Sequence, residues 1–152
     1  MLHYDFEESI GFWLSRAWNS YEKAINLELT PRGITFRQAQ VLGYLAFEGD
    51  LSQVELAERM KVEPPTLVGI LDRMERDGWI TRLDCAQDRR KKMIHPLPQA
   101  EPIWAEIVEV ATGVRKRAVQ GLSSGQVDQL KQLLATVERN LAAEKLAEER
   151  AS

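Results

Sequence analysis

The sequence is poor in the residues on which most catalytic and metal centres depend. Its 152 residues include one cysteine, Cys85, and two histidines, His3 and His95. A single cysteine excludes an internal disulfide framework, and Cys85 has no neighbouring Cys or His at the spacing of a zinc site. We therefore expect no metal and no cofactor.

Signatures of catalysis, membrane insertion and export are also missing. The sequence has no G-x-S-x-G, Walker or H-E-x-x-H motif, and its carboxylates form no evident pair. There is no run of 18 apolar residues, and the N-terminus does not place a basic region before an apolar one. These absences predict a cytoplasmic protein that is neither an enzyme nor a membrane protein.

The chain does have enough apolar content for a core, and its charge is unevenly distributed. With 44% hydrophobic residues it suits one domain, alone or with attached oligomerisation helices. The net charge is −3, yet residues 59–95 carry 9 Lys/Arg against 6 Asp/Glu, while residues 1–58 carry 4 against 9. If the chain binds DNA, its acidic remainder would repel the phosphates and direct them to this basic segment. Judged by charge alone, the excess of positive residues in 59–95 is also compatible with chance.

Capping signatures mark the helix starts. Before the first signature, apolar residues at helical spacing predict a helix over about 5–28. The second helix is expected over 36–48, with Val41, Leu42, Leu45 and Ala46 facing inward. Three S/T-x-x-E/Q boxes predict helix starts at Thr35 with Gln38, Ser52 with Glu55, and Ser123 with Gln126.

The segment 53–77 has the pattern of a helix-turn-helix. A short helix over 53–60 is expected to bury Val54, Leu56, Ala57 and Met60. The next helix, 64–77, opens with two prolines, which only the first turn tolerates. Its apolar residues are Leu67, Ile70, Leu71 and Met74, and its opposite face carries Thr66, Gly69, Arg73 and Arg76.

After Gly78 the apolar period changes from 3.6 to about 2. Two strands are predicted over 79–85 and 92–97, joined by the charged segment 88–92. A basic hairpin alone is often only a solvated loop, but here it directly follows a helix-turn-helix. The fold class is therefore predicted as mainly α with a small β-wing, a winged helix-turn-helix over 34–98.

These segments resemble the MarR family of bacterial transcription regulators. The resemblance rests on LSQVELAERM (51–60), PTLV (65–68), LDRMERDG (71–78) and DRR (88–90). The stretch 81–104, with DCAQDRR (84–90) and QAEP (99–102), is most similar to the SlyA-like branch. The resemblance covers most of the chain and implies a DNA-binding regulator.

The family pattern implies roles for individual residues. Asp88 would hold the wing tip, Arg90 would enter the minor groove, and Arg89 would contact phosphate. Recognition-helix contacts would fall on Pro65, Thr66, Gly69 and Arg73. SlyA-like proteins have arginine at the position of Gly69, where a bidentate guanine contact would originate, so either the operator differs here or specificity depends more on the wing and on DNA shape. The segment His95-Pro96-Leu97-Pro98 also departs from the family.

The terminal segments 1–30 and 99–147 are expected to be dimerisation helices. The last helix carries a heptad seam, which in isolation is equally compatible with a core helix of one subunit. A homodimer agrees with the resemblance and would read a pseudo-palindromic operator. Repression is the expected outcome, with activation as an alternative. The seam consists of Val127, Leu130, Leu134, Val137 and Leu141.

The resemblance also implies a cleft for a small aromatic or phenolic effector. Candidate lining residues are Trp13, Ala17, Phe36, Gln40 and Trp104. Plain core packing is the competing interpretation for each of them. For the whole protein, the rival interpretation is a winged helix that binds proteins without sequence-specific DNA binding.

Overall fold

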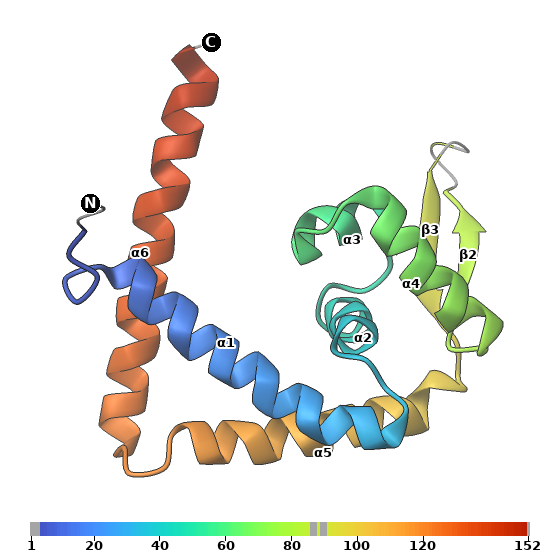
Figure 1. The fold of residues 1–152 in the computed structure, drawn as a ribbon. Coiled ribbons are helices and arrows are strands. Elements are labelled where there is room, and N and C mark those ends of the chain that lie inside the picture. Colours follow the sequence, from blue (N-terminus) through green and yellow to red (C-terminus); the bar gives the residue numbers. More distant parts are fainter. Residues whose placement is uncertain (1–3, 86–87, 89–90, 152) are drawn as a thin grey trace. The chain divides into compact units, whose positions relative to one another are not determined.

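The computed structural model describes residues 4–85, 88 and 91–151, with side chains described as far as Ala142. His3, Arg89 and Arg90 lie outside this set. The described residues form six α-helices and a small antiparallel sheet (Figure 1). The predicted fold class, mainly α with a small β-wing, is confirmed. In chain order the elements are α1 (Ile10–Leu29), the 3-10 turn η1 (Thr30–Arg32), α2 (Phe36–Glu48), β1 (Leu51–Ser52), α3 (Gln53–Met60), α4 (Pro64–Arg76), β2 (Ile80–Asp84), β3 (Lys92–Pro96), α5 (Ala100–Ala118) and α6 (Ser124–Ala151).

The chain divides into two compact units, residues 1–114 and 115–152. The division falls near the end of α5, so most of that helix belongs to the first unit. Within the first unit, α5 buries Ile107, Val110 and Val114 in the same core as α2 and α4. Among the described residues, no helix is both long enough and apolar enough to cross a membrane.

All three predicted capping boxes are present. At the start of α3, the Ser52 hydroxyl accepts from the Glu55 N–H at 3.2 Å, and the Glu55 carboxylate accepts from the Ser52 N–H at 2.8 Å. Hydrogen bonding with Ser52 holds the pKa of Glu55 below its usual value. The Ser52 side chain contributes most, followed by its backbone. The predicted bounds of α2 and α3 are confirmed, and α6 begins at its box.

The predicted start of the first helix at about residue 5 is wrong. The helix begins at Ile10, where the Ser9 hydroxyl caps it by accepting from the Phe12 N–H. Further upstream, the Asp5 carboxylate accepts from two following backbone amides. Such a local side-chain turn competes with helix formation. The apolar period of the sequence therefore extended beyond the helix itself.

The helix-turn-helix buries nearly the residues that the sequence predicted. Leu67, Leu71 and Met74 of α4 are fully buried, and Ile70 is 3% exposed. Val54, predicted inward, is 63% exposed. At 100° per residue it is turned roughly 110° from the centre of the buried face of α3. Ala46, also predicted inward, is exposed and lines a cavity beside α2.

The sheet has the order β1-β3-β2, and all its neighbours are antiparallel. The β2–β3 hairpin is the predicted wing, with each strand slightly shorter than expected. β1 was not predicted, because it has only two residues and its second residue, Ser52, is also the cap of α3. Its pairing of Leu51 with Ile94 joins the base of the wing to the start of the helix-turn-helix.

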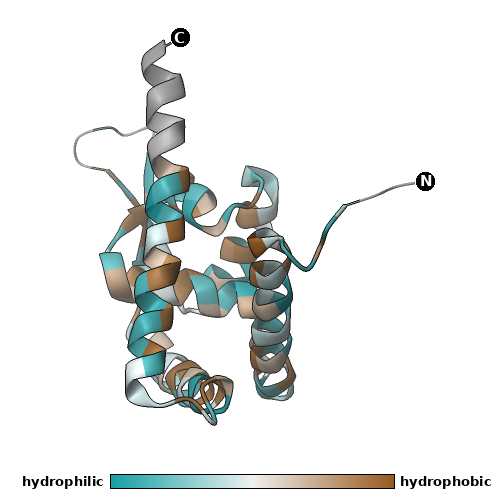
Figure 2. Ribbon diagram, turned by 90° about the vertical axis from the view of Figure 1, so that its left-hand side faces the viewer, coloured by the Kyte–Doolittle hydropathy of each residue, from teal (hydrophilic) through white to brown (hydrophobic). Residues whose placement is uncertain are grey.

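Apolar side chains on the terminal helices are left uncovered. In α1 only Ile25 and Leu29 are buried, while Trp13 is 51% and Trp18 50% exposed. In Figure 2 the coloured part of α6, below the label C, shows both apolar and polar residues along its length. Leu133 and Leu134 on this helix are 58% and 42% exposed. Both helices therefore present apolar side chains that their own unit does not bury.

Candidate nucleic-acid interface

The predicted recognition residues share one face of α4. Pro65, Thr66 and Arg73 are exposed, and Gly69 is half-buried. At 100° per residue the four positions span an arc of about 100°. The buried positions Leu67 and Met74 lie on the other side of the helix. The sequence thus divides α4 into a core face and a continuous outer face.

The first turn of α4 offers few backbone donors to a phosphate. Pro64 and Pro65 have no N–H, and the N–H groups of Thr66 and Leu67 both donate to the Glu63 carbonyl oxygen. Glu63 also places a carboxylate at the N-cap position. Helix N-termini usually attract anions, but this one is largely blocked. An anion at this face of α4 would therefore have to be bound by side chains.

Arg82 links the wing to α4. Its guanidinium pairs with Asp72 at 2.6 Å and with Glu75, and its backbone N–H donates to the Glu75 carboxylate at 3.1 Å. The Arg82 side chain is only 19% exposed. Because Arg82 lies on β2 and both acids lie on α4, the network fixes the hairpin against the helix. Figure 1 shows the two elements lying beside each other.

Backbone hydrogen bonds connect the described residues at the tip of the wing. The Lys91 N–H donates to the Asp88 carbonyl oxygen at 2.9 Å, and the Cys85 N–H donates to the Lys91 carbonyl oxygen at 3.1 Å. Asp88 is half-buried. Below the tip, Lys92 of β3 pairs with Asp84 of β2. The predicted roles of Arg89 and Arg90 fall on positions outside the described residues.

Charged side chains near α4 differ in how far they are already paired. Arg76, which the sequence placed on the outer face, donates to Asp77 at 3.0 Å, and this hydrogen bond raises its pKa. Arg73 is exposed and has no ion pair within the described residues. Lys91 is exposed at the wing. Arg73 is therefore better suited than Arg76 or Arg82 to meet an external phosphate or base.

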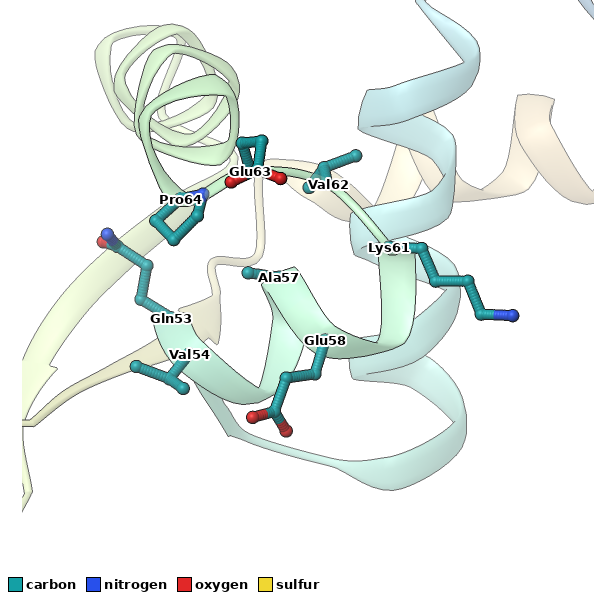
Figure 3. Close-up of a pocket in the computed structure, with 8 residues that line it drawn as sticks. All are labelled: Gln53, Val54, Ala57, Glu58, Lys61, Val62, Glu63 and Pro64. Carbon is teal, nitrogen blue, oxygen red and sulfur yellow. The ribbon is translucent and has the colours of Figure 1, made fainter. Parts of the chain in front are cut away.

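A hollow of about 500 Å³ lies beside the turn between α3 and α4 (Figure 3). Its charged lining residues are Glu58, Lys61 and Glu63. In Figure 3, Lys61 points to the opposite side from Gln53 and Val54, so the long side chains do not converge. Two carboxylates against one ammonium also disfavour a phosphate. The lining of this hollow therefore does not favour nucleic acid.

Neither the 500 Å³ hollow nor a further cavity of about 310 Å³ gathers the five predicted effector residues. Trp13 and Ala17 are exposed on α1, and the buried Phe36 has its ring 6.0 Å from that of Trp18. The Gln40 side-chain oxygen accepts from Arg37 at 2.9 Å. Trp104 lines the 310 Å³ cavity, together with residues that the sequence interpretation did not select. The signal that could have found them was the proline-flanked segment 95–98.

Comparisons with known proteins agree with the winged-helix fold described above. A family model described as MarR family matches residues 32–91. The structure of transcriptional regulator PA3341 matches with a TM-score of 0.81 and 30% identity, covering 89% of this chain and 99% of that one. A mutant of MarR from E. coli complexed with operator DNA matches with a TM-score of 0.76 and 25% identity, covering 89% and 99%.

A further match concerns a regulator with a known small-molecule effector. The structure of Bordetella bronchiseptica BpsR, which addresses regulation of its DNA binding by 6-hydroxynicotinic acid, has a TM-score of 0.76 at 22% identity. The match covers 90% of this chain and 98% of that one. At this identity the likeness concerns the fold. None of these matches favours a particular branch of the family.

Proposed function

The chain belongs to the MarR family of transcription regulators, and we propose that it is a homodimeric, sequence-specific DNA-binding repressor. The observation that carries the proposal is the outer face of α4, with Thr66 and Arg73 exposed, fixed beside the wing by Arg82. In this proposal α4 reads the major groove and the wing enters the minor groove. Repression follows if the bound dimer blocks polymerase.

Individual roles follow from the family pattern and the geometry of the helix. Pro65, Thr66, Gly69 and Arg73 form the surface of α4 that faces the bases and phosphates. Asp88 holds the wing tip, Arg90 enters the minor groove and Arg89 contacts phosphate. A guanidinium suits the negative potential of a narrow minor groove. Because Gly69 has no side chain, specificity depends more on the wing and on DNA shape than in SlyA-like proteins, the branch to which we assign the chain.

Dimerisation is supported by the uncovered apolar side chains of α1 and α6. In this proposal residues 34–98 form the DNA-binding lobe, and residues 1–30 and 99–147 supply the dimer interface. Exposed aromatic and leucine side chains in such number are typical of a surface that another chain covers. A two-fold dimer would set two copies of α4 about 34 to 36 Å apart, one turn of DNA.

A small aromatic or phenolic effector completes the proposal, with the protein acting in the cytoplasm. Control of BpsR by 6-hydroxynicotinic acid supports this part by analogy of fold alone. Trp13, Ala17, Phe36, Gln40 and Trp104 remain the proposed contacts. Trp13 and Ala17 lie on an exposed part of α1, so a cleft that includes them would be completed only by further protein surface.

Selection of bound sequences from random duplex DNA by the purified protein tests the proposal. The wild type is compared with Arg90→Ala and with Arg139→Ala, which removes the same charge from the exposed surface of α6. We expect an enriched inverted repeat for the wild type and Arg139→Ala, and loss of enrichment for Arg90→Ala. Arg73→Ala should also lower the slope of log affinity against log salt by about one.

Absence of sequence enrichment would contradict the proposal. If a folded dimer enriches no sequence and its weak DNA binding hardly depends on salt, the protein is not a DNA-reading regulator under these conditions. A winged-helix module that binds another protein would then be the better account, and Arg89→Ala and Arg90→Ala would leave its activity intact.

A further inference from the structure

A cavity of about 310 Å³ lies within the first unit, between α2 and the segment that joins β3 to α5. Most of its wall is apolar. α2 contributes Leu42, Leu45 and Ala46, the joining segment contributes Pro96 and Leu97, and α5 contributes Trp104. This volume lies at the lower end of the range for small-molecule sites, which are mostly apolar with a few polar groups.

This cavity is distinct from the effector cleft proposed above. Leu45 follows Phe36 by nine residues, which at 100° per residue places it about half a turn around α2. Phe36 and Gln40 therefore lie on the opposite face of the helix from the cavity. Trp104 is the one residue common to both sets. The rest of the wall depends on the segment 95–98, where the sequence departs from its relatives.

The ionisable groups around the cavity favour a positive charge. Glu101 lies in the first turn of α5, and its carboxylate has no ion pair within the described residues. None of the described lysine or arginine residues lines the cavity. The other polar lining residue, His95, contacts the Asp50 carboxylate through Nδ1 at 2.8 Å. The cavity therefore has one unpaired carboxylate, that of Glu101, at its edge, while the Asp50 carboxylate is already bound to His95.

Glu101 and Trp104 are placed to act on the same ligand. They are three residues apart on α5, a spacing that puts their β-carbons about 5 to 6 Å apart on one face of a helix. A carboxylate beside an indole ring is the combination that recognises organic cations, because both the negative charge and the ring face attract a positive group. The apolar walls suit an attached ring.

We propose that this cavity binds a small aromatic cation, with its ammonium group near Glu101 and Trp104 and its ring against Leu45 and Pro96. The wall is connected to the wing, since the Leu97 N–H donates to the carbonyl oxygen of Trp79, next to β2, at 2.9 Å. A ligand bound in the cavity would therefore affect the position of the base of the wing. Only this regulatory consequence rests on the proposed function; the binding itself does not.

Isothermal titration calorimetry on the full chain at pH 8 tests the binding, with benzyltrimethylammonium as the cationic probe and benzoate as the anionic one. The wild type should bind the cation at least fivefold more tightly than benzoate. Glu101→Gln should weaken cation binding about fivefold and remove most of the preference. Glu138→Gln, the same change on the exposed surface of α6, should leave both affinities unchanged.

A second variant, Ala46→Phe, fills the mouth of the cavity from an exposed position and should weaken binding of the cation at least tenfold. Thermal unfolding of each variant shows that the fold is retained. Equal affinity for the two probes in the wild type, or cation binding that survives both Glu101→Gln and Ala46→Phe, would overturn the proposal. Because DNA is absent, the titration does not depend on whether the chain reads an operator.

Discussion

The helix-turn-helix lobe and the terminal helices differ in how fully their apolar side chains are buried. In the lobe, Leu71 and Met74 of α4 are fully buried by neighbours from the same chain. In the terminal helices, Trp18 of α1 and Leu133 of α6 remain at least half exposed. A core of about 60 residues can be closed by one chain, whereas uncovered faces of this kind are typical of a protein interface. The core of the lobe is completed within one chain, with α5 contributing to it, whereas apolar side chains of α1 and α6 stay uncovered.

The largest effect is expected from Leu71→Ala in the core of the lobe. Removing a fully buried leucine side chain leaves a cavity and should lower the free energy of unfolding by about 2 to 5 kcal/mol. Urea denaturation measures the loss. Val68→Ala, on an exposed part of the same helix, is the control and should cost less than about 1 kcal/mol. Similar losses for both variants would contradict the burial pattern of α4.

The next largest effect is expected from Leu134→Glu on α6. A carboxylate buried in an apolar dimer interface should weaken association by at least about 2 kcal/mol, on the order of 30-fold in the dimer dissociation constant. Sedimentation velocity measures the change in mass, and the helical content of the lobe should be retained. Gln132→Glu places the same charge on an exposed polar position of α6 and should leave the mass unchanged. A dimer that tolerates both substitutions would show that this part of α6 is not the interface.

A smaller effect is expected from Arg82→Gln, which removes the link between the wing and α4. Asp72 and Glu75 would lose their shared cation, so the free energy of unfolding should fall by roughly 1 to 2 kcal/mol. DNA affinity should fall further than this loss of stability explains, while the molecular mass stays that of the wild type. Arg76→Gln, whose partner Asp77 is its exposed neighbour, should change stability by less than about 0.5 kcal/mol. Equal DNA affinity for Arg82→Gln and the wild type would argue against a positioning role for this network.

The smallest expected effect is a gain in stability from Gly69→Ala. Gly69 lies inside α4, and a β-carbon there would meet no atom within 4 Å. Alanine should therefore stabilise the protein by about 0.5 to 1 kcal/mol through better helix propensity. Gly78→Ala, at a φ of 75°, should instead destabilise it because alanine disfavours that conformation. Gly69→Arg starts from the same unobstructed β-carbon position and should change the selected operator in favour of guanine.

Much of the lobe could be predicted because its signals are local. The capping boxes at Thr35 and Ser52 determine helix starts within four residues of sequence, and the spacing of Leu67 to Met74 determines which face of α4 is buried. The predictions that failed involve competition or contact beyond one element. Asp5 forms its own turn ahead of α1, and β1 exists only because Leu51 pairs with Ile94, 43 positions away in the chain.

The candidate site was predicted to a similar extent. Recognition positions on α4 follow from helical periodicity, so the sequence alone placed Thr66, Gly69 and Arg73 on one face. The pairing state of the arginines did not follow, because Arg82 meets Asp72 and Glu75 only when the hairpin folds back onto the helix. The cavity at Trp104 likewise depends on α2 meeting the segment 95–104, about 50 residues further along the chain.

By itself, the sequence determined the mainly α fold class, the order of elements in the lobe and the apolar faces of its helices, because hydrogen bonding and amphipathic spacing operate over a few residues. Tertiary structure decided which cations are already paired, where β1 joins the wing, and that Glu101 and Trp104 edge a cavity. These features need residues far apart in the chain to meet, and the energies of such contacts exist only in the folded protein.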